Sequence, residues 1–245
     1  LYTTGSKMPM AIMPSGTTND FATSVGIVPT VVGLYYLIKD FNVVPTDIGC
    51  FNEKDYFLNV AAGGILSEVA HNVSIESKTM LGKTAYITSG MKTIAEKGFK
   101  TTRLLFEIDG VKEEIDVYFF ILANSKNVSG FSKINKKKKI NDGYMDLCII
   151  KSLDILNAVP IFTSILDGSH KNNKSVEYRQ VRYVKISAID ENTVFHLDCD
   201  GEYAGELPMH VEVLKGGVNL LLPTESRKTK NIVAQQDETK IQIRD

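Results

Sequence analysis

The chain has 245 residues, of which 43% are hydrophobic and 23% are charged, so its composition is that of a globular protein with one large or two ordinary domains. Its formal net charge of −1 argues against a general nucleic-acid binder. The longest apolar run, Val117 to Ala123, is too short to span a membrane, and the 3 widely spaced cysteines indicate reduced core residues of a cytosolic protein rather than a disulfide or zinc framework.

The first 45 residues have an α/β pattern. The apolar run Met10–Met13 predicts a strand, and the residues that follow predict a helix over Asn19–Val25 that Gly26 ends. A second helix is expected to begin near Pro29.

A short polar segment, Pro14-Ser15-Gly16-Thr17-Thr18-Asn19-Asp20-Phe21-Ala22, connects the expected strand to the first helix. A tight glycine turn before a helix leaves backbone N–H groups unpaired and directs the helix dipole outward, which suits an anion such as phosphate. Thr18 or Asn19 can cap the helix, and Asp20 in its first turn fits the dipole. The alternative is a capped loop that binds no ligand.

From about Asp47 onward the pattern changes to strands. The pair Asp109-Gly110 predicts a hairpin turn, because it separates two stretches in which apolar residues recur. Helices are expected only over 83–97 and 153–166, the second one bent or restarted at Pro160. The expected strands are Lys54–Val60, 103–108, Ile115–Ala123, Met145–Ile150, Val181–Ala188, Thr193–Cys199 and Val211–Leu214.

An acidic patch is expected at the end of the strand that ends near residue 200. Strand alternation places every second side chain on one face, so two carboxylates share a face and Glu202 follows one glycine later. Such a patch can hold Mg²⁺ or accept a proton; the alternative is an Asp-Gly turn whose acids only face water. The apolar face has Phe195, Leu197 and Cys199, and the polar face has His196, Asp198 and Asp200.

The string from Pro14 to Ala22 resembles the P-x-G-T-x-N-D-F-A signature of the diacylglycerol kinase catalytic-domain family. That family includes soluble bacterial diacylglycerol kinases, phosphatidylglycerol kinases and, more distantly, ceramide and sphingosine kinases. The resemblance extends from residue 9 to about residue 222. Its further segments are Phe57-Leu58-Asn59-Val60-Ala61-Ala62-Gly63-Gly64, Gly82-Lys83-Thr84-Ala85-Tyr86, Ile140-Asn141-Asp142-Gly143-Tyr144-Met145-Asp146 and Asp200-Gly201-Glu202.

The resemblance implies a fold of two parts with the active site between them. Residues 1–45 would be the end of an N-terminal α/β nucleotide-binding domain, and residues 46–222 an antiparallel β-sandwich with helical insertions. Residues 223–245 would be a polar tail that either frays or packs back on the first domain.

The implied activity is that of a lipid kinase, which transfers the γ-phosphoryl group of ATP to the hydroxyl of diacylglycerol or a similar lipid in phospholipid biosynthesis, with Mg²⁺ as cofactor. Phosphatidylglycerol or another lipid acceptor, and a lipid-binding pseudokinase, are the alternatives. The family also has a Gly-Gly-Asp-Gly-Thr nucleotide loop upstream, which nothing in this chain matches. We therefore interpret the sequence as the C-terminal portion of a longer protein, inactive without that loop.

The family's site residues transfer by position. The catalytic set is Asp200 and Glu202, of which either could be the base, with Asp20 near the active-site Mg²⁺. The nucleotide-binding set is Gly16, Thr17 and Asn19, in which Thr17 contacts phosphate. A second, structural Mg²⁺ would be held by the carboxylate of Asp142 and the backbone carbonyls of Lys139 and Tyr144.

A run of lysines, Lys133 and Lys136–Lys139, departs from the family pattern, which often has proline and small residues there. A lipid kinase must reach a substrate in a membrane, and each lysine near an anionic surface contributes about 1 kcal/mol. The run therefore predicts peripheral membrane contact of a cytoplasmic protein; the alternative is a solvated loop. Nucleic acid is not an expected partner, and homodimerisation is left open.

Overall fold

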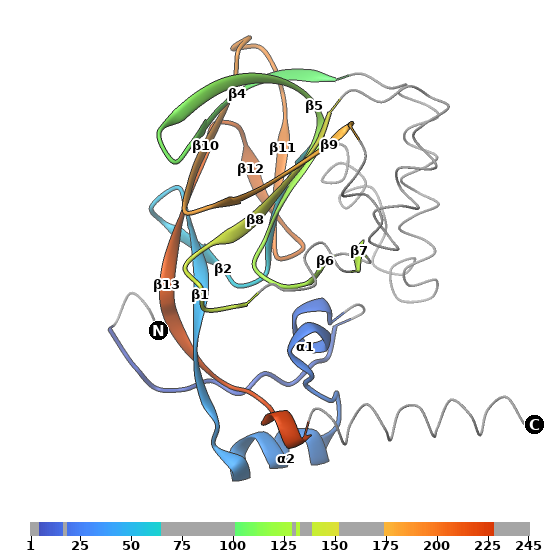
Figure 1. Cartoon of the computed structure of the whole chain (residues 1–245), viewed down its shortest axis with the longest axis vertical. Helices are drawn as coiled ribbons and strands as arrows, with labels where there is room; N and C mark the ends of the chain where they lie inside the picture. The colour runs from blue at the N-terminus through green and yellow to red at the C-terminus, as the bar shows by residue number, and fades with distance from the viewer. Residues whose placement is uncertain are drawn as a thin grey trace, which may run out of the picture.

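Two short helices and thirteen strands make up the described part of the chain, which in this computed structural model is residues 5–16, 19–64, 101–128, 131–132, 139–151 and 174–227 (Figure 1). All the paired strands are antiparallel. The elements are α1 (Asp20–Val25), α2 (Val31–Asp40), β1 (Val43–Phe51), β2 (Asp55–Phe57), β3 (Val60–Gly64), β4 (Thr102–Ile108), β5 (Val111–Ala123), β6 (Asn127–Val128), β7 (Phe131–Ser132), β8 (Met145–Lys151), β9 (Val176–Val181), β10 (Tyr183–Ala188), β11 (His196–Cys199), β12 (Glu202–Glu206) and β13 (Met209–Leu221).

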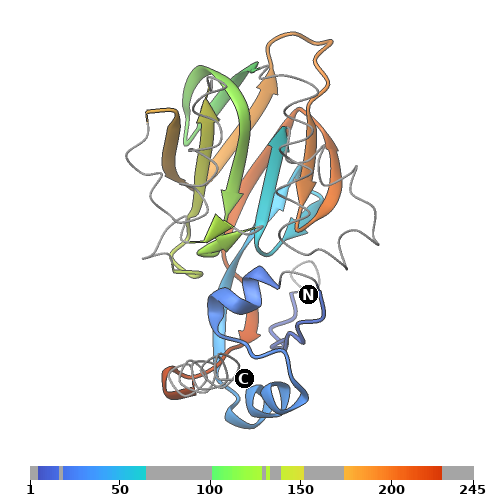
Figure 2. The same cartoon turned by 90° about the vertical axis from the view of Figure 1, so that its right-hand side faces the viewer.

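The long strand β5 joins the two halves of the main sheet. Its first half, through Val117, pairs with β4, and its second half, Phe119–Ala123, pairs with β3 on one side and β8 on the other. The register with β8 shifts between Val117 and Phe119. One half of the sheet is therefore β12-β11-β3-β5-β8-β9 and the other is β5-β4-β10-β13-β1-β2 (Figure 2).

The two halves enclose one hydrophobic core. Phe120 on β5 is fully buried, stacked on Phe195 with ring centroids 6.0 Å apart, and meets Phe106 of β4 edge-on at 6.2 Å. Gly63 on β3 lies against these rings, and a Cβ there would be 2.6 Å from the Phe120 ring. Only glycine leaves room for this packing, which explains the first glycine of the Gly63-Gly64 pair.

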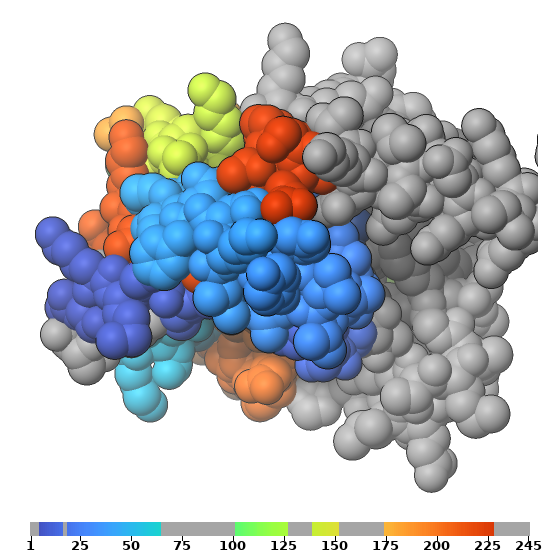
Figure 3. All heavy atoms as spheres, turned by 90° about the horizontal axis from the view of Figure 1, so that it is seen from below, coloured from blue at the N-terminus to red at the C-terminus, as the bar shows by residue number. Residues whose placement is uncertain are grey.

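Strands β1 and β13 run side by side from the sandwich to the two helices (Figure 1). There the apolar end of β13 packs against both helices, and Met10 bridges to Leu220 in parallel orientation. The residues after β13, red in Figure 3, then lie against the blue segment that contains α2. There the Arg227 guanidinium lies 3.6 Å from the centroid of the Tyr36 ring and binds the Asp40 carboxylate. These helices, β13 and the residues after it thus share a second, smaller core.

Several expected elements are confirmed. The first helix ends where Gly26 adopts a left-handed φ of 80° and donates its N–H to the carbonyls of Ala22 and Thr23. The second helix begins after Thr30, whose hydroxyl accepts the Gly33 N–H. The Asp109-Gly110 hairpin turn joins β4 to β5 as expected.

Other expectations are wrong in detail. The strand expected over Met10–Met13 is a single bridge at Met10. The strand expected over Lys54–Val60 is divided between β2 and β3, and the one over Val181–Ala188 breaks at Arg182 between β9 and β10. The proposed boundary at 45/46 falls inside β1, and the division into domains stays a prediction. The helices expected over 83–97 and 153–166 lie outside the described residues.

Candidate active site

The Asp-Gly-Glu turn that joins β11 to β12 is attached to the start of β3 through the Asp200 carboxylate. This carboxylate accepts three consecutive backbone N–H groups: Leu58 at 2.7 Å on Oδ2, and Asn59 and Val60 at 2.9 Å each on Oδ1. Asp200 itself has a left-handed φ of 52° and donates its N–H to the Val60 carbonyl. The backbone that fixes the carboxylate is distant in sequence, since Val60 and Asp200 are 140 residues apart.

The surroundings of Asp200 make it a better proton acceptor than an ordinary aspartate. The residue as a whole is exposed, but its carboxylate is embedded against the β3 backbone, and this desolvation raises its pKa. The three N–H groups oppose the rise, and the nearby charge of Glu202 adds to it. The side chain of Glu202 is exposed, and its backbone pairs with Cys199 of β11.

The expected alternation along β11 is confirmed. Leu197 is buried in the core, whereas His196 and Asp198 are half-buried on the other face. The Asp198 carboxylate accepts the Gly201 N–H at 2.9 Å and so stabilises the same turn. The acidic patch at this strand end therefore has one carboxylate that holds the turn, one that is held by β3, and one that faces solvent.

A buried carboxylate, that of Asp47 in the middle of β1, was not singled out from the sequence. It is fully buried, and its oxygens accept the Gly143 N–H at 2.7 Å and the Gly216 N–H at 2.8 Å. Its own N–H donates to the Ile140 carbonyl at 2.7 Å. The only signal in the sequence was an acid next to the apolar stretch that begins at Ile48.

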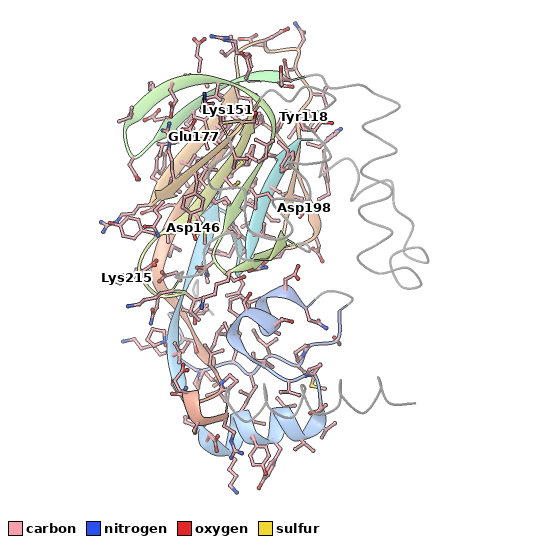
Figure 4. All side chains as sticks on the ribbon, turned by 45° about the vertical axis from the view of Figure 1, so that its right-hand side comes forward. Tyr118, Asp146, Lys151, Glu177, Asp198 and Lys215 are labelled. Atoms are coloured by element: carbon pink, nitrogen blue, oxygen red, sulfur yellow. The ribbon has the colours of Figure 1, made fainter. Side chains whose placement is uncertain are left out.

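The Asn-Asp-Gly loop before β8 is held in place by Asp47 and by its own turn. Gly143 has a φ of 81°, and the Asp142 carboxylate accepts the Tyr144 N–H at 3.1 Å. The Arg182 guanidinium covers the Tyr144 ring, 4.5 Å from its centroid. In Figure 4, Lys215, whose side chain lies against Gly143, is on the opposite side of the sandwich from Asp198.

This loop offers the oxygen donors that Mg²⁺ prefers. A half-buried carboxylate at Asp142 and the carbonyls of Lys139 and Tyr144 are hard ligands, and few protein ligands suffice because Mg²⁺ keeps waters. Among the described residues, no group of three or more histidines, cysteines and acids is placed to hold a metal. A cation here would therefore depend on backbone carbonyls, as the loop supplies.

The glycine turn before α1 is closed by one side chain. The Asn19 amide accepts the Gly16 N–H at 2.9 Å and donates to the Gly16 carbonyl at 2.8 Å. Asn19 is the N-cap residue of α1, one of the two positions expected, but its side chain makes no capping hydrogen bond because both ends of the amide bind Gly16. Asp20 is half-buried in the first turn of α1, and Thr17 lies outside the described residues.

The sequence and the fold of this chain are similar to those of known proteins. Residues 59–222 match the family described as the YegS C-terminal NAD kinase beta sandwich-like domain. A solved structure of a putative diacylglycerol kinase from Bacillus anthracis has the same fold, with a TM-score of 0.70 at 24% identity over 88% of this chain and 68% of that one. In the part of the chain that the structure describes, no helix is long and apolar enough to cross a membrane.

Curated relatives narrow the class further. The diacylglycerol kinase of Bacillus subtilis is 33% identical over 90% of this chain and 71% of its own length. That of Staphylococcus carnosus is 30% identical over 93% of this chain and 72% of its own length. The chain belongs to the diacylglycerol kinase family.

Replacing Asp47 with Asn is expected to destabilise the fold. The substitution leaves one acceptor oxygen for the two N–H groups of Gly143 and Gly216, so one buried donor loses its partner at a cost of about 1–3 kcal/mol. Urea denaturation measures the loss. The matched control is Asp190→Asn, an exposed aspartate that also accepts a backbone N–H, at 3.0 Å from Asn192. Equal stability of the two variants would show that Asp47 does not organise this region.

Proposed function

We propose that this protein is a lipid kinase that transfers the terminal phosphoryl group of ATP to the hydroxyl of diacylglycerol or a similar lipid, beside the Asp-Gly-Glu turn. The observation that carries the proposal is the Asp200 carboxylate, held by three backbone N–H groups. The names of the relatives, diacylglycerol kinase, support the substrate class. Phosphatidylglycerol, another lipid acceptor and a lipid-binding pseudokinase are the alternatives that a lipid panel with labelled ATP would distinguish.

Asp200 is the stronger candidate for the base. A carboxylate has about four acceptor positions, and three N–H bonds leave one, on Oδ2. In the proposed step the lipid hydroxyl oxygen bonds to the γ-phosphorus, the bond from that phosphorus to the ADP oxygen breaks, and the hydroxyl proton passes to Asp200 Oδ2. The negative charge of Glu202 raises the affinity of Asp200 for that proton.

The other site residues are proposed to serve nucleotide and cation. The turn that Asn19 closes would present Gly16 and Thr17 to phosphate, with Asp20 near the cation, which neutralises phosphate charge when bound. The parallel bridge between Met10 and Leu220 and the two helices beside it support an α/β nucleotide-binding domain in this region.

Asp200→Asn in the full-length protein is expected to lower kcat by about 10²–10⁴-fold, because the general base is lost. Glu202→Gln is expected to keep more activity and to move the acid limb of the pH–rate profile to lower pH. The sign follows because removal of a like charge lowers the raised pKa of Asp200. Lipid phosphorylation with labelled ATP across pH measures both effects.

Glu191→Gln is the control, since Glu191 is an exposed acid on another turn. Urea denaturation run alongside separates catalysis from folding, because Asp200→Asn also weakens three bonds to a charged acceptor, each worth about 1.5–3 kcal/mol. If the Asp200→Asn enzyme folds and keeps the parental kcat, Asp200 is not the general base. Loss of activity in Glu202→Gln alone would transfer the base to Glu202.

The Asn-Asp-Gly loop is proposed to bind Mg²⁺ through Asp142 and the carbonyls of Lys139 and Tyr144. Added Mg²⁺ should then raise the Tm of the parent protein, because a ligand that binds only the folded state stabilises it. Asp142→Ala should abolish this rise and lower activity, whereas Asp190→Ala should keep the rise. Thermal denaturation over a Mg²⁺ titration measures the change in Tm. If the Tm of the parent protein does not change with Mg²⁺, the loop does not bind the metal.

The lysine run is proposed to contact anionic membrane. Replacing Lys136–Lys139 with Ser should weaken binding to phosphatidylglycerol-containing vesicles, most of all at low salt, because exposed charges are screened within about 10 Å at 0.1 M. Vesicle co-sedimentation measures it. Equal sedimentation of parent and variant at low salt would favour a solvated loop. A control variant replaces four lysines elsewhere that are exposed, Lys54, Lys112, Lys174 and Lys185.

A further inference from the structure

Asn124, the residue directly after β5, is fully buried and has one side-chain orientation. Its amide nitrogen donates to the carbonyl of Asp47 at 2.7 Å and to the carbonyl of Leu58 at 2.9 Å. Because both neighbours are acceptors, the nitrogen must face them. The Oδ1 atom is buried and has no hydrogen-bond partner among the described residues. The two carbonyls therefore need a hydrogen-bond donor in the place of the Asn124 amide nitrogen, whereas no described group needs the amide oxygen.

The two carbonyls that Asn124 binds near β3 belong to the peptide units that hold Asp200. The unit between Leu58 and Asn59 has its carbonyl bound by the Asn124 side chain and its N–H bound to Asp200. The next unit, between Asn59 and Val60, has its carbonyl bound by the Asn124 backbone N–H at 2.8 Å and its N–H bound to Asp200. A peptide unit is a rigid plane, so fixing its carbonyl also fixes the direction of its N–H.

The other acceptor of the Asn124 amide leads to the Asn-Asp-Gly loop. Asp47 binds that loop through its N–H to the Ile140 carbonyl and through its carboxylate to the Gly143 N–H. One buried amide thus connects the loop that is proposed to bind Mg²⁺ with the turn that bears the proposed base.

We infer that Asn124 is a positioning residue that aims the peptide N–H groups at Asp200 and couples Asp200 to the Asn-Asp-Gly loop. The inference rests on the proposed function, because Asp200 is its base. Asn124 acts only through the Leu58–Val60 backbone and through Asp47. Loss of its side-chain donor lets the peptide plane between Leu58 and Asn59 rotate, which weakens the bond from the Asn59 N–H to Asp200 and frees the carboxylate from its productive orientation. The next plane keeps its anchor, because the backbone N–H of residue 124 still binds the Asn59 carbonyl.

Asn124→Asp tests the inference, since it keeps the size of the side chain and places an oxygen where the nitrogen donated. Amide hydrogen exchange of Asn59 and Gly143 should accelerate by about tenfold, the factor that corresponds to loss of one ordinary hydrogen bond. Val60 should respond less, because the backbone N–H of residue 124 still binds the Asn59 carbonyl. Amides of the β4–β10 ladder, such as Phe106, should exchange as in the parent. In the full-length protein, kcat should fall by between about 10-fold and 100-fold with KM for ATP unchanged.

Two further variants complete the experiment. Asn42→Ala is the matched control, because the Asn42 amide donates to a backbone carbonyl, that of Leu222 at 3.1 Å, outside this path. Asn124→Ser, which adds no charge and keeps one donor, replaces Asn124→Asp if the latter does not fold.

The inference is overturned if Asn59 keeps parental exchange in the Asn124 variants, if Gly143 does not respond with it, or if every ladder accelerates equally. Exchange is read without substrate, so its outcome stands apart from the proposed function. A protein that phosphorylates no lipid while Asn59 and Gly143 respond would refute the function and keep the coupling.

Discussion

Capture of backbone N–H groups by two carboxylates is the interaction on which the rest of this structure depends. Asp200 takes the N–H groups of the three residues at the start of β3, Leu58–Val60, and Asp47 takes those of Gly143 and Gly216. Buried or constrained N–H groups outside a strand ladder need an acceptor, and a carboxylate supplies two strong ones. Each aspartate thereby organises a loop that the sheet alone would leave without a defined shape.

The architecture brings these loops to the ends of strands that belong to different halves of the sheet. β5 contributes to both halves, and Asn124 directly after it contacts segments from β1 and from the approach to β3. A base held by rigid peptide units costs little reorganisation at the moment of proton transfer. Under the proposed function, this is a physical reason for Asp200 to be held by backbone rather than by mobile side chains.

Local signals in the sequence predicted the elements that local interactions stabilise. Gly26 ended the first helix, and Asp109-Gly110 made the hairpin turn, because both depend on residues that tolerate positive φ. β1 was absent from the expected strands, the first of which began at Lys54, since Pro45, Asp47 and Gly49 all disfavour strands. Pairing with β13 overrides these preferences, and the bulge between Thr46 and Ile48 accommodates the irregularity.

The sequence by itself determined the family, through the Pro14–Ala22, Asn-Asp-Gly and Asp-Gly-Glu strings. It also determined which residue types are available to bind a cation or accept a proton, namely carboxylates. Only the tertiary structure decided that Asp200 is held by β3 while Glu202 faces solvent, and that Asp47 and Asn124 connect the two loops. The physical reason is that the partners of these side chains are backbone N–H and carbonyl groups. Every residue has them, so no residue type marks their positions until the fold brings distant segments together.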